Sequence, residues 1–385
     1  MIKQLMTQAN PVINPLERTH TRLIGAHMPT SGGIQKSLIS GKEIGCTVVQ
    51  LFTGSPRQWS HPELTEETVQ LFRATHAETG IQELIAHDSY LINLAAPDPA
   101  VMNRSRGAFR SELDRASRLG ISWVVTHMGA HLNQGEDEAV QRLIESLKLI
   151  LDETDALGWT AGIALETTAG QGTGLGWKFE QLGTILKGVG DHPRLGVCMD
   201  TCHVFVAGND IRDAVTFNHT IEEFDKLVGL KYLKVIHAND SVKGLGSRVD
   251  RHAHIGEGTI GFEAFRLIST DPRLLHVPII VETPDAETMH AVNVGKLARM
   301  ASGIIGVQLQ LHGSYSDLTP DSTVCLELPC GSTLVELVDA AISAYPKLEG
   351  IRSHCRFAIK DTVIDTDTLL QEGDVVALLP PSSGG

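Results

Sequence analysis

Six short apolar runs in this chain, rich in β-branched residues, each end on a residue type that binds metal ions. The terminal residues are His87, His127, Glu166, Asp200, His237 and Glu282. A strand of a parallel sheet is buried on both faces and therefore reads as a continuous apolar run. In a closed barrel of such strands, the functional side chains lie at the C-terminal strand ends. Six metal-binding residue types at six strand ends therefore predict a fold that brings them together.

Residues 23–300 predict eight strands that alternate with helices. The expected strands are Leu23–Ala26, Thr47–Leu51, Leu84–Ala86, Trp123–Thr126, Gly162–Leu165, Leu195–Met199, Tyr232–Ile236 and Ile279–Val281. Between them lie amphipathic segments of helical length, each followed by a glycine; they include Glu66–Thr79, Asn103–Leu119, Glu136–Leu157 and Ile221–Val228. Eight βα units over about 280 residues are typical of an α/β protein with a (β/α)₈ TIM barrel.

Around residues 301–306 this alternation stops, which predicts a second, smaller domain. Strands are expected at Gly306–His312, Val324–Leu328, Cys355–Ile359, Thr362–Ile364 and Asp374–Leu379, with a helix at Thr333–Tyr345. This order is typical of a small α+β roll. We therefore divide the chain into an N-terminal extension (residues 1–20), a barrel domain (21–302) and a C-terminal domain (303–385) that ends in Pro-Pro-Ser-Ser-Gly-Gly.

Composition narrows the class of protein further. No apolar stretch is long enough to span a bilayer and no signal pattern is present at the N-terminus, so we expect a cytoplasmic protein without a membrane partner. The six cysteines include no Cys-x-x-Cys pair, which favours reduced thiols. The net charge of −14 argues against a nucleic-acid partner. However, residues 301–385 hold 11 acidic and 4 basic residues, and so carry half of that excess.

Two further clusters raise the number of candidate metal ligands to nine. The motif DTCH places His203 just past Asp200, and GSRVDRHAHIGEG places Asp250 and His252 in the loop after the seventh strand. One catalytic zinc takes three protein ligands, so nine ligands indicate two or three ions. Mixed His and carboxylate ligands suit zinc, manganese or iron. Clustered ions of this kind are most useful in the hydrolysis of phosphate esters.

Other residues near these motifs are weaker candidates. Cys198 and Cys202 flank Asp200. Strand direction and the abundance of His and carboxylate make these thiols poor candidates for zinc ligands. We interpret His27, His131 and His254 as loop residues or as partners that orient the ligands.

Residues 23–300 resemble the endonuclease IV family of DNA-repair enzymes. The matching segments are HDSYLINLA (87–95), ETTAGQGTGLG (166–176), GVCMDTCHVFVAG (196–208), GSRVDRHAHIGEGTIG (246–261) and VET (281–283). The resemblance implies a TIM barrel with three zinc ions, with manganese as an alternative at some positions. It also implies that the substrate is duplex DNA with abasic sites. Hydrolysis 5′ to the abasic site would leave a 3′-hydroxyl and a 5′-deoxyribose phosphate.

The resemblance also assigns the nine ligands to three ions. The first ion is held by His87, His127 and Glu166. The second is held by Glu166, which bridges the two ions, together with Asp200, His237 and Glu282. The third is held by His203, Asp250 and His252. The implied catalytic residues are Glu166 and Glu282.

The family's DNA-binding residues correspond to four positions of this sequence. They are Arg57 and Gln58 in SPRQW, and Tyr90 and Leu91 in HDSYL. Side chains of this kind wedge into the base stack while the abasic nucleotide leaves the duplex. The sequence departs from the usual family pattern at Gly54 and Ser55, which puts the grip on the DNA backbone in question. Met128 replaces the usual proline and is expected to change only loop stiffness.

Residues 305–385 resemble small sulfur-carrier proteins of ubiquitin-like (β-grasp) fold, namely the molybdopterin synthase small subunit and ThiS. The matching segments are LELPCGSTLVELVDAAISAYP (326–346) and DTLLQEGDVVALLPPSSGG (367–385). The resemblance implies that the C-terminal carboxylate, after Gly384 and Gly385, is adenylated and converted to a thiocarboxylate. A tail without Cβ atoms can thread an enzyme's channel. The implied partners are the molybdopterin synthase large subunit and an adenylating and sulfurating enzyme.

Two alternative hypotheses stay open from the sequence. Related barrels with metal ligands at their strand ends act on sugars, so a sugar isomerase is the first alternative. The ligand set His203, Asp250 and His252 argues against it. The second alternative is a carrier or interaction protein attached to an inactive barrel.

Overall fold

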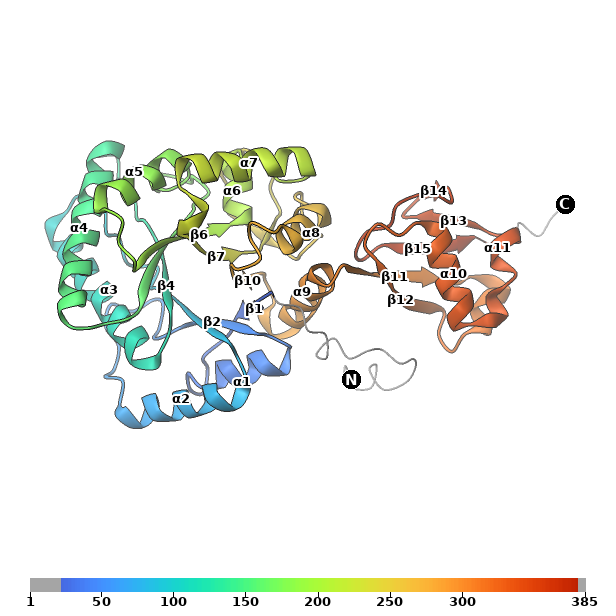
Figure 1. Cartoon of the computed structure of the whole chain (residues 1–385), viewed down its shortest axis with the longest axis horizontal. Helices are drawn as coiled ribbons and strands as arrows, with labels where there is room; N and C mark the ends of the chain where they lie inside the picture. Colours follow the sequence, from blue (N-terminus) through green and yellow to red (C-terminus); the bar gives the residue numbers. More distant parts are fainter. Residues whose placement is uncertain (1–21, 380–385) are drawn as a thin grey trace. The chain divides into compact units, whose positions relative to one another are not determined.

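The computed structural model describes residues 22–379, which form two compact units that divide between Val294 and Gly295 (Figure 1). The expected N-terminal extension and the terminal Gly384 and Gly385 lie outside the described residues. Within residues 22–379, no helix combines the length and the apolar character needed to cross a membrane.

The larger unit is a closed barrel of eight parallel strands. Its strands are β1 (Ile24–His27), β2 (Val48–Phe52), β3 (Glu83–His87), β4 (Trp123–His127), β5 (Gly162–Glu166), β6 (Leu195–Asp200), β7 (Leu233–His237) and β10 (Ile279–Val281). They close in the order β1-β10-β7-β6-β5-β4-β3-β2. A two-stranded ribbon, β8 (Asp240–Ser241) with β9 (His252–Ala253), lies in the loop after β7. The predicted TIM barrel is therefore confirmed.

Helices surround the barrel (Figure 1). They are α1 (Lys36–Glu43), α2 (Glu66–Thr79), α3 (Pro99–Leu119), α4 (Glu136–Ala156), α5 (Phe179–Val189), α6 (Thr201–Ala207), α7 (Ala214–Leu227), α8 (Phe262–Thr270) and α9 (Ala286–Ala301). Two of them begin earlier than the apolar periodicity predicted. The helix expected from Asn103 begins at Pro99, because Asp98 caps it and proline suits a first helical position. The helix expected from Ile221 begins at Ala214, because a capping box on Asp213 starts it.

An apolar layer fills the barrel interior below the C-terminal strand ends. Seven strands each contribute one buried residue to it: Val48, Ile85, Val125, Ala164, Cys198, Val235 and Ile280. Successive side chains of a strand point to opposite faces, so the residue two positions further along points to the same side. The strands therefore place a second layer directly above this one, at the end of the barrel that carries the functional loops.

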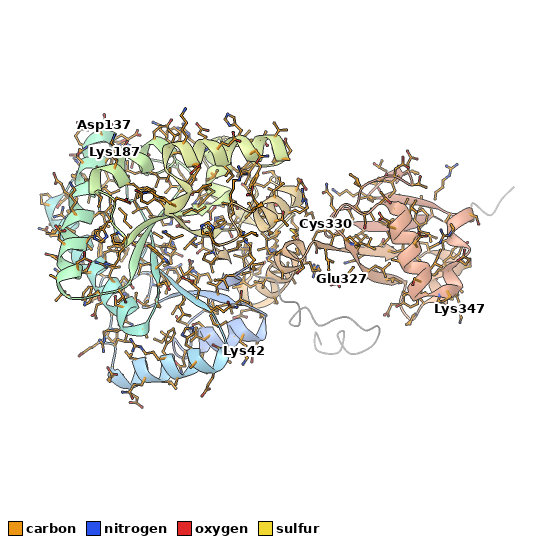
Figure 2. The ribbon with its side chains drawn as sticks, viewed as in Figure 1. Lys42, Asp137, Lys187, Glu327, Cys330 and Lys347 are labelled. Atoms are coloured by element: carbon orange, nitrogen blue, oxygen red, sulfur yellow. The ribbon has the colours of Figure 1, made fainter. Side chains whose placement is uncertain are left out.

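The smaller unit contains a five-stranded mixed sheet. Its elements are β11 (Ile304–Gln310), β12 (Thr323–Pro329), α10 (Leu334–Ala344), α11 (Ile351–His354), β13 (Arg356–Ile359), β14 (Thr362–Ile364) and β15 (Val375–Leu379). The strand order is β12-β11-β15-β13-β14, with β11 parallel to β15 and every other pair antiparallel. On β12, Val324 and Leu328 are buried, whereas Cys325 is exposed. Glu327 of the same strand is also exposed (Figure 2). This architecture is consistent with the predicted β-grasp fold.

Candidate metal centre

The layer above the apolar one is polar, with one side chain from each strand of the barrel. Its members are His27, Gln50, His87, His127, Glu166, Asp200, His237 and Glu282. Glu282 directly follows β10, and His27 lies opposite Gln50 in the register of β1 and β2. The six strand-end residues identified from the sequence therefore occupy one level of one barrel, close enough to bind shared metal ions.

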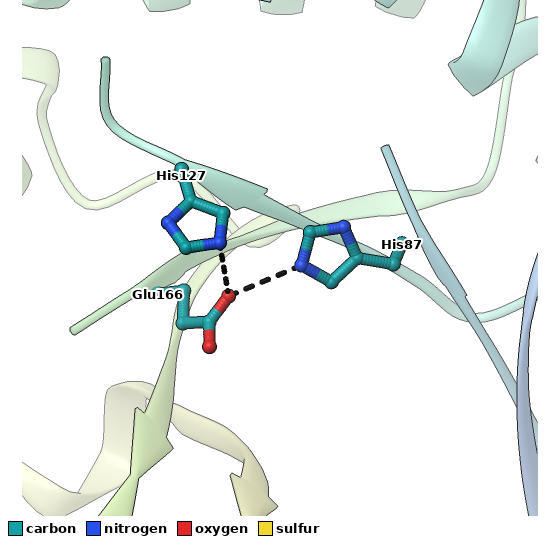
Figure 3. A group of neighbouring side chains, drawn as sticks. All are labelled: His87, His127 and Glu166. Atoms are coloured by element: carbon teal, nitrogen blue, oxygen red, sulfur yellow. Dashed lines mark hydrogen bonds and ion pairs between the residues drawn. The ribbon is translucent and has the colours of Figure 1, made fainter. Parts of the chain in front are cut away.

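Glu166 is at the centre of the first ligand group (Figure 3). Its Oε2 atom lies 3.2 Å from His87 Nε2 and 3.3 Å from His127 Nε2. The carbonyl oxygen of Asp88, which can only accept, lies 3.0 Å from His87 Nδ1. In the neutral ring, His87 Nδ1 therefore carries the proton, and Nε2 presents its lone pair to the centre. His87, His127 and Glu166 make a three-residue set of the kind that holds one ion.

The other carboxylate oxygen of Glu166 faces a second ligand group. Glu166 Oε1 lies 3.0 Å from His237 Nδ1, and Glu282 Oε2 lies 3.1 Å from the same nitrogen. Asp200 Oδ2 is 3.9 Å from it. The ligand atoms of these four residues all lie within 4.8 Å of one another. Glu166 therefore belongs to both groups, as a bridging carboxylate must.

His203, Asp250 and His252 form a third ligand group. Asp250 Oδ2 lies 3.1 Å from His203 Nε2, and Asp250 Oδ1 lies 3.3 Å from His252 Nε2. His252 Nε2 also lies 3.7 Å from Asp200 Oδ2, so this buried nitrogen faces two carboxylates. An imidazole nitrogen that faces carboxylates is suited to binding a metal ion together with them.

The DTCH turn between β6 and α6 sets the direction of His203. Asp200 caps α6 by accepting a hydrogen bond from the backbone amide of His203 at 2.9 Å. His203 Nδ1 donates to the carbonyl oxygen of Thr167 at 2.8 Å. The Nε2 atom of His203 is therefore left unprotonated in the neutral ring and faces Asp250.

The charged groups of the centre shift one another's pKa strongly. Burial alone would raise the pKa of Glu166 and Glu282, but the neighbouring histidines outweigh burial and hold both pKa values well below the ordinary range. Burial likewise opposes charge on the imidazoles, yet the nearby carboxylates raise the pKa of His87 to about 9 and that of His203 to about 10. The centre thus stabilises positive charge among its buried carboxylates, which is what a cation site requires.

Two thiols lie within reach of these groups. Cys198 is close to Glu166 and His237, and Cys202 is close to Asp250. Burial raises the pKa of both thiols to about 12. That the imidazoles and carboxylates bind the ions in preference to these thiols stays a prediction from the sequence.

Three buried polar residues beside the ligands were missed in the sequence: Gln50, Asp88 and Asn239. Asn239 Nδ2 donates to Asp200 Oδ2 at 2.7 Å, and its Oδ1 accepts from the backbone amide of Glu282 at 2.8 Å. Strand alternation was the available signal. Asn239 follows His237 by two residues and Gln50 follows Val48 by two, so both share the inner side of the barrel with residues already identified.

The three histidines that the sequence suggested as loop or orienting residues, His27, His131 and His254, differ in their relation to the site. His27 belongs to the polar layer, and its Nδ1 lies 3.2 Å from Glu282 Oε1. His254 lies 3.3 Å from the side chain of Asn293, and the backbone amide of His131 donates to Thr173. His27 therefore touches a ligand, whereas these contacts of His254 and His131 are to residues outside the nine ligands.

The four expected DNA-binding residues lie in two loops that are joined by hydrogen bonds. Arg57 and Gln58 are exposed in the loop after β2. The backbone amide of Tyr90 donates to the carbonyl oxygen of Pro56 at 3.2 Å. Tyr90 is 64% exposed, and its ring meets that of Phe52 edge-on at 5.6 Å. Both loops therefore project at the rim of the polar layer.

Two open hollows share Tyr90, His127, His203 and Asp250 in their linings. One, of about 310 Å³, is lined by ligands of all three groups and by Tyr90. The other, of about 350 Å³, is lined by Tyr90, Leu91, Asn93 and Gln171, and it reaches His203 and Asp250. An extended ligand that entered either hollow would therefore contact Tyr90 and candidate metal ligands, whereas Arg57 and Gln58 line neither hollow.

Comparison with known proteins relates this barrel to one family. Residues 40–301 match the family model described as a xylose isomerase-like TIM barrel. The Probable endonuclease 4 of Chloroflexus aggregans is 50% identical to this chain over 265 residues, which cover 69% of this chain and 92% of the relative. The Probable endonuclease 4 of Geobacter sulfurreducens is 46% identical over 279 residues, which cover 72% of this chain and 94% of the relative.

Solved structures agree with this relation. The crystal structure of endonuclease IV from Thermus thermophilus covers 73% of this chain and 99% of that chain, with 33% sequence identity and a TM-score of 0.65. A D-psicose 3-epimerase matches with a TM-score of 0.53 at 15% identity, which shows a shared barrel fold alone. Residues 309–385 match the ThiS family model.

Proposed function

The chain belongs to the endonuclease IV family, and from this premise we propose that its barrel is a zinc-dependent apurinic/apyrimidinic endonuclease. The proposed reaction is hydrolysis of the phosphodiester 5′ to an abasic site in duplex DNA. Its products are a 3′-hydroxyl and a 5′-deoxyribose phosphate. The observation that carries the proposal is the position of Glu166, whose two oxygens face two ligand groups on opposite sides. A bridging carboxylate of this kind is typical of clustered-metal sites that cleave phosphate esters.

The side chains of the centre fit three zinc ions. His87, His127 and Glu166 would hold one, Glu166 with Asp200, His237 and Glu282 a second, and His203, Asp250 and His252 a third. Mixed imidazole and carboxylate sets suit zinc, and manganese is an alternative at the carboxylate-rich set. Bound ions would lower the pKa of a water molecule and neutralise the charge that develops on the phosphate. Glu282, held against His237 and His27, is placed to orient the attacking water.

Selection of the damaged nucleotide is assigned to the two rim loops. A nucleotide must leave the base stack to reach the buried ligands, and this costs least where no base is stacked. Tyr90 is exposed at the rim and Leu91 lines the hollow beside it. We assign these residues, with Arg57 and Gln58, to the gap that the abasic nucleotide leaves.

Incision of a defined duplex tests the proposal. The full chain with zinc should cut a duplex that carries one tetrahydrofuran abasic analogue once, directly 5′ to the analogue, and leave a 3′ end that a polymerase extends. Loss of a partner that only orients a metal ligand lowers activity by about 10- to 100-fold. Glu166→Gln changes a proposed ligand itself, so it should lower the incision rate by at least about 100-fold. The exposed Glu145→Gln is the matched control and should cut like the wild type. If the wild-type protein with zinc did not cut the abasic duplex, the proposed function would be wrong.

For the C-terminal domain we propose a role as a sulfur carrier. In this proposal an adenylating enzyme transfers AMP from ATP to the terminal carboxylate of Gly385 and releases pyrophosphate. Hydrosulfide from a sulfur donor then displaces AMP and leaves a thiocarboxylate, which the molybdopterin synthase large subunit would accept. The ThiS family match over residues 309–385 supports the proposal.

Mass spectrometry tests the carrier role. After incubation with ATP, a ThiS-type adenylating enzyme and a sulfur donor, the full chain should gain the mass of one oxygen-to-sulfur exchange. A chain that lacks Gly384 and Gly385 should gain none. An unchanged mass of the full chain, under conditions that modify an authentic carrier, would leave the domain an interaction module.

A further inference from the structure

Gln50 is a buried amide in the polar layer, and it contacts three other members of that layer. It is 0% exposed and lies in β2. Its Oε1 lies 2.8 Å from His237 Nε2, and its Nε2 lies 2.6 Å from Glu282 Oε1. The same amide nitrogen lies 2.9 Å from His27 Nδ1. One side chain from β2 therefore joins ligands of β7 and β10 to the histidine of β1.

The geometry determines which group donates in the contact with His237. Three carboxylates approach His237 at Nδ1, which is the side of the proposed metal ion. To bind an ion there the neutral ring must have its lone pair on Nδ1, and hence its proton on Nε2. The Gln50 atom beside Nε2 must therefore be the carbonyl oxygen.

The orientation of His237 thus depends on a side chain, unlike that of its neighbours. His87 Nδ1 lies 3.0 Å from the carbonyl oxygen of Asp88, and His203 Nδ1 lies 2.8 Å from that of Thr167. In those two rings a main-chain oxygen fixes the tautomer, and no substitution can remove it. In His237 the Gln50 side chain serves the same purpose, so this ligand can be altered by one mutation.

The contacts of the Gln50 amide nitrogen follow from the position of its carbonyl oxygen. With Oε1 on His237, the amide nitrogen faces Glu282 Oε1 and His27 Nδ1 and has one hydrogen for each. Glu282 is then held by Oε1, which leaves its Oε2 toward His237. A carboxylate at position 50 would put two acceptors together at Glu282, and an apolar side chain would leave the Nε2–H group of His237 without its acceptor.

We propose that Gln50 is a positioning residue that fixes His237 as an Nδ1 metal ligand and Glu282 as an Oε2 ligand. This inference rests on the proposed metal centre. It adds a residue outside the nine ligands whose amide, with one acceptor and two donors, is the chemical group that the layer requires at β2. Gln50 acts through His237 and Glu282 and does not itself touch the substrate.

Zinc binding by the full chain tests the inference without DNA. The variants are Gln50→Met, which keeps size but removes both polar functions, and Gln50→Glu, which keeps only the acceptors. Loss of such partners lowers metal affinity by about 10- to 100-fold. Both variants should therefore show this loss for one of the bound zinc ions in competition with a chromophoric chelator. Gln181→Met, at a buried glutamine of α5, is the matched control and should bind zinc like the wild type.

The tautomer of His237 supplies a second readout that simple destabilisation would not change. In zinc-loaded protein with ¹⁵N-labelled histidine, the His237 ring should show a proton on Nε2, and Gln50→Glu should keep that proton while zinc affinity falls. Unchanged zinc affinity in both folded variants, or a wild-type His237 ring protonated on Nδ1, would overturn the inference. If Gln50→Met does not fold, Gln50→Glu and the wild-type spectrum still decide. Because DNA is absent, failed incision with intact zinc binding would count against the proposed function and not against Gln50.

Discussion

At the scale of single residues, Gly54 is where the loop that carries Arg57 meets a packed side chain. A Cβ atom at Gly54 would lie 2.5 Å from the His61 ring. That ring cannot move freely, because its Nε2 lies 3.2 Å from Glu112 Oε1 and because the second oxygen of Glu112 accepts a hydrogen bond from Thr53. Glycine at this departure from the family pattern is therefore compatible with close packing of the loop.

We predict that Gly54→Ala shifts this loop and weakens DNA binding. Overpacking of this kind costs about 1–3 kcal/mol in the free energy of unfolding, and KM for abasic duplex should rise more than kcat falls, because Arg57 lies in the loop and not at the ligands. Gly107→Ala is the control. A Cβ atom there meets nothing within 4 Å, and alanine in a helix is favoured by about 0.5–1 kcal/mol. Equal KM values for the two variants would show that the loop tolerates the added atom.

The sequence predicts which side chains belong to the site, but it does not predict which of them contact one another. The apolar runs and their polar ends located six side chains of the polar layer, and the alternation from Val48 would have located Gln50. The partners of Gln50 could not be predicted, since His237 and Glu282 are 187 and 232 residues away and meet it only when the barrel closes. Distances between ligands depend on register, which an apolar pattern does not set to within an ångström.

At the scale of elements, strand positions were predictable and two helix starts were not. Most strands of this barrel have a polar residue at or directly after their C-terminal end, whereas α3 and α7 begin at caps on Asp98 and Asp213 that precede the apolar periodicity. In the smaller unit, a partly buried ion pair joins α9 to the turn before β15. Arg299 pairs with Glu372, which is 2% exposed and also accepts from the backbone amide of Gly306 in β11 at 2.6 Å.

We predict that Glu372→Ala loosens β11 and β15. Removal of the carboxylate leaves the Gly306 amide without its acceptor, which costs about 1–3 kcal/mol, and it also leaves Arg299 without its partner. Hydrogen exchange of the full chain should accelerate in both strands and stay unchanged in the barrel strands. Glu349→Ala removes an exposed pair with Arg352 and should change exchange little. Hydrogen exchange in β11 of Glu372→Ala that is as slow as in the wild type would contradict this prediction.

At the scale of the whole molecule, the chain joins a complete endonuclease IV-like barrel to a ThiS-family domain. The relatives from Chloroflexus aggregans and Geobacter sulfurreducens are matched over 92% and 94% of their own length by 69% and 72% of this chain. Nearly the whole length of each relative is thus matched by the barrel portion of this chain.

We predict that a chain ending at Gly303 keeps its incision activity. All nine ligands and the four rim residues precede that point, so kcat/KM should stay within about twofold, as expected for a domain with its own core. The measurement is incision of the abasic duplex by equal concentrations of folded protein. A fall on the order of tenfold, or about 1.4 kcal/mol in the activation free energy, would show that the C-terminal domain contributes to the reaction.

The central claim is that the polar layer of the barrel cleaves abasic DNA with the help of bound metal ions. The most direct measurement is the incision rate of chelator-stripped full chain during titration with zinc. We expect no incision of the abasic duplex without metal, full recovery as zinc approaches three equivalents per chain, and no cleavage of the intact duplex at any point. Stripped protein that cuts at the untreated rate, or restored protein that cuts intact and abasic duplexes equally, would contradict it.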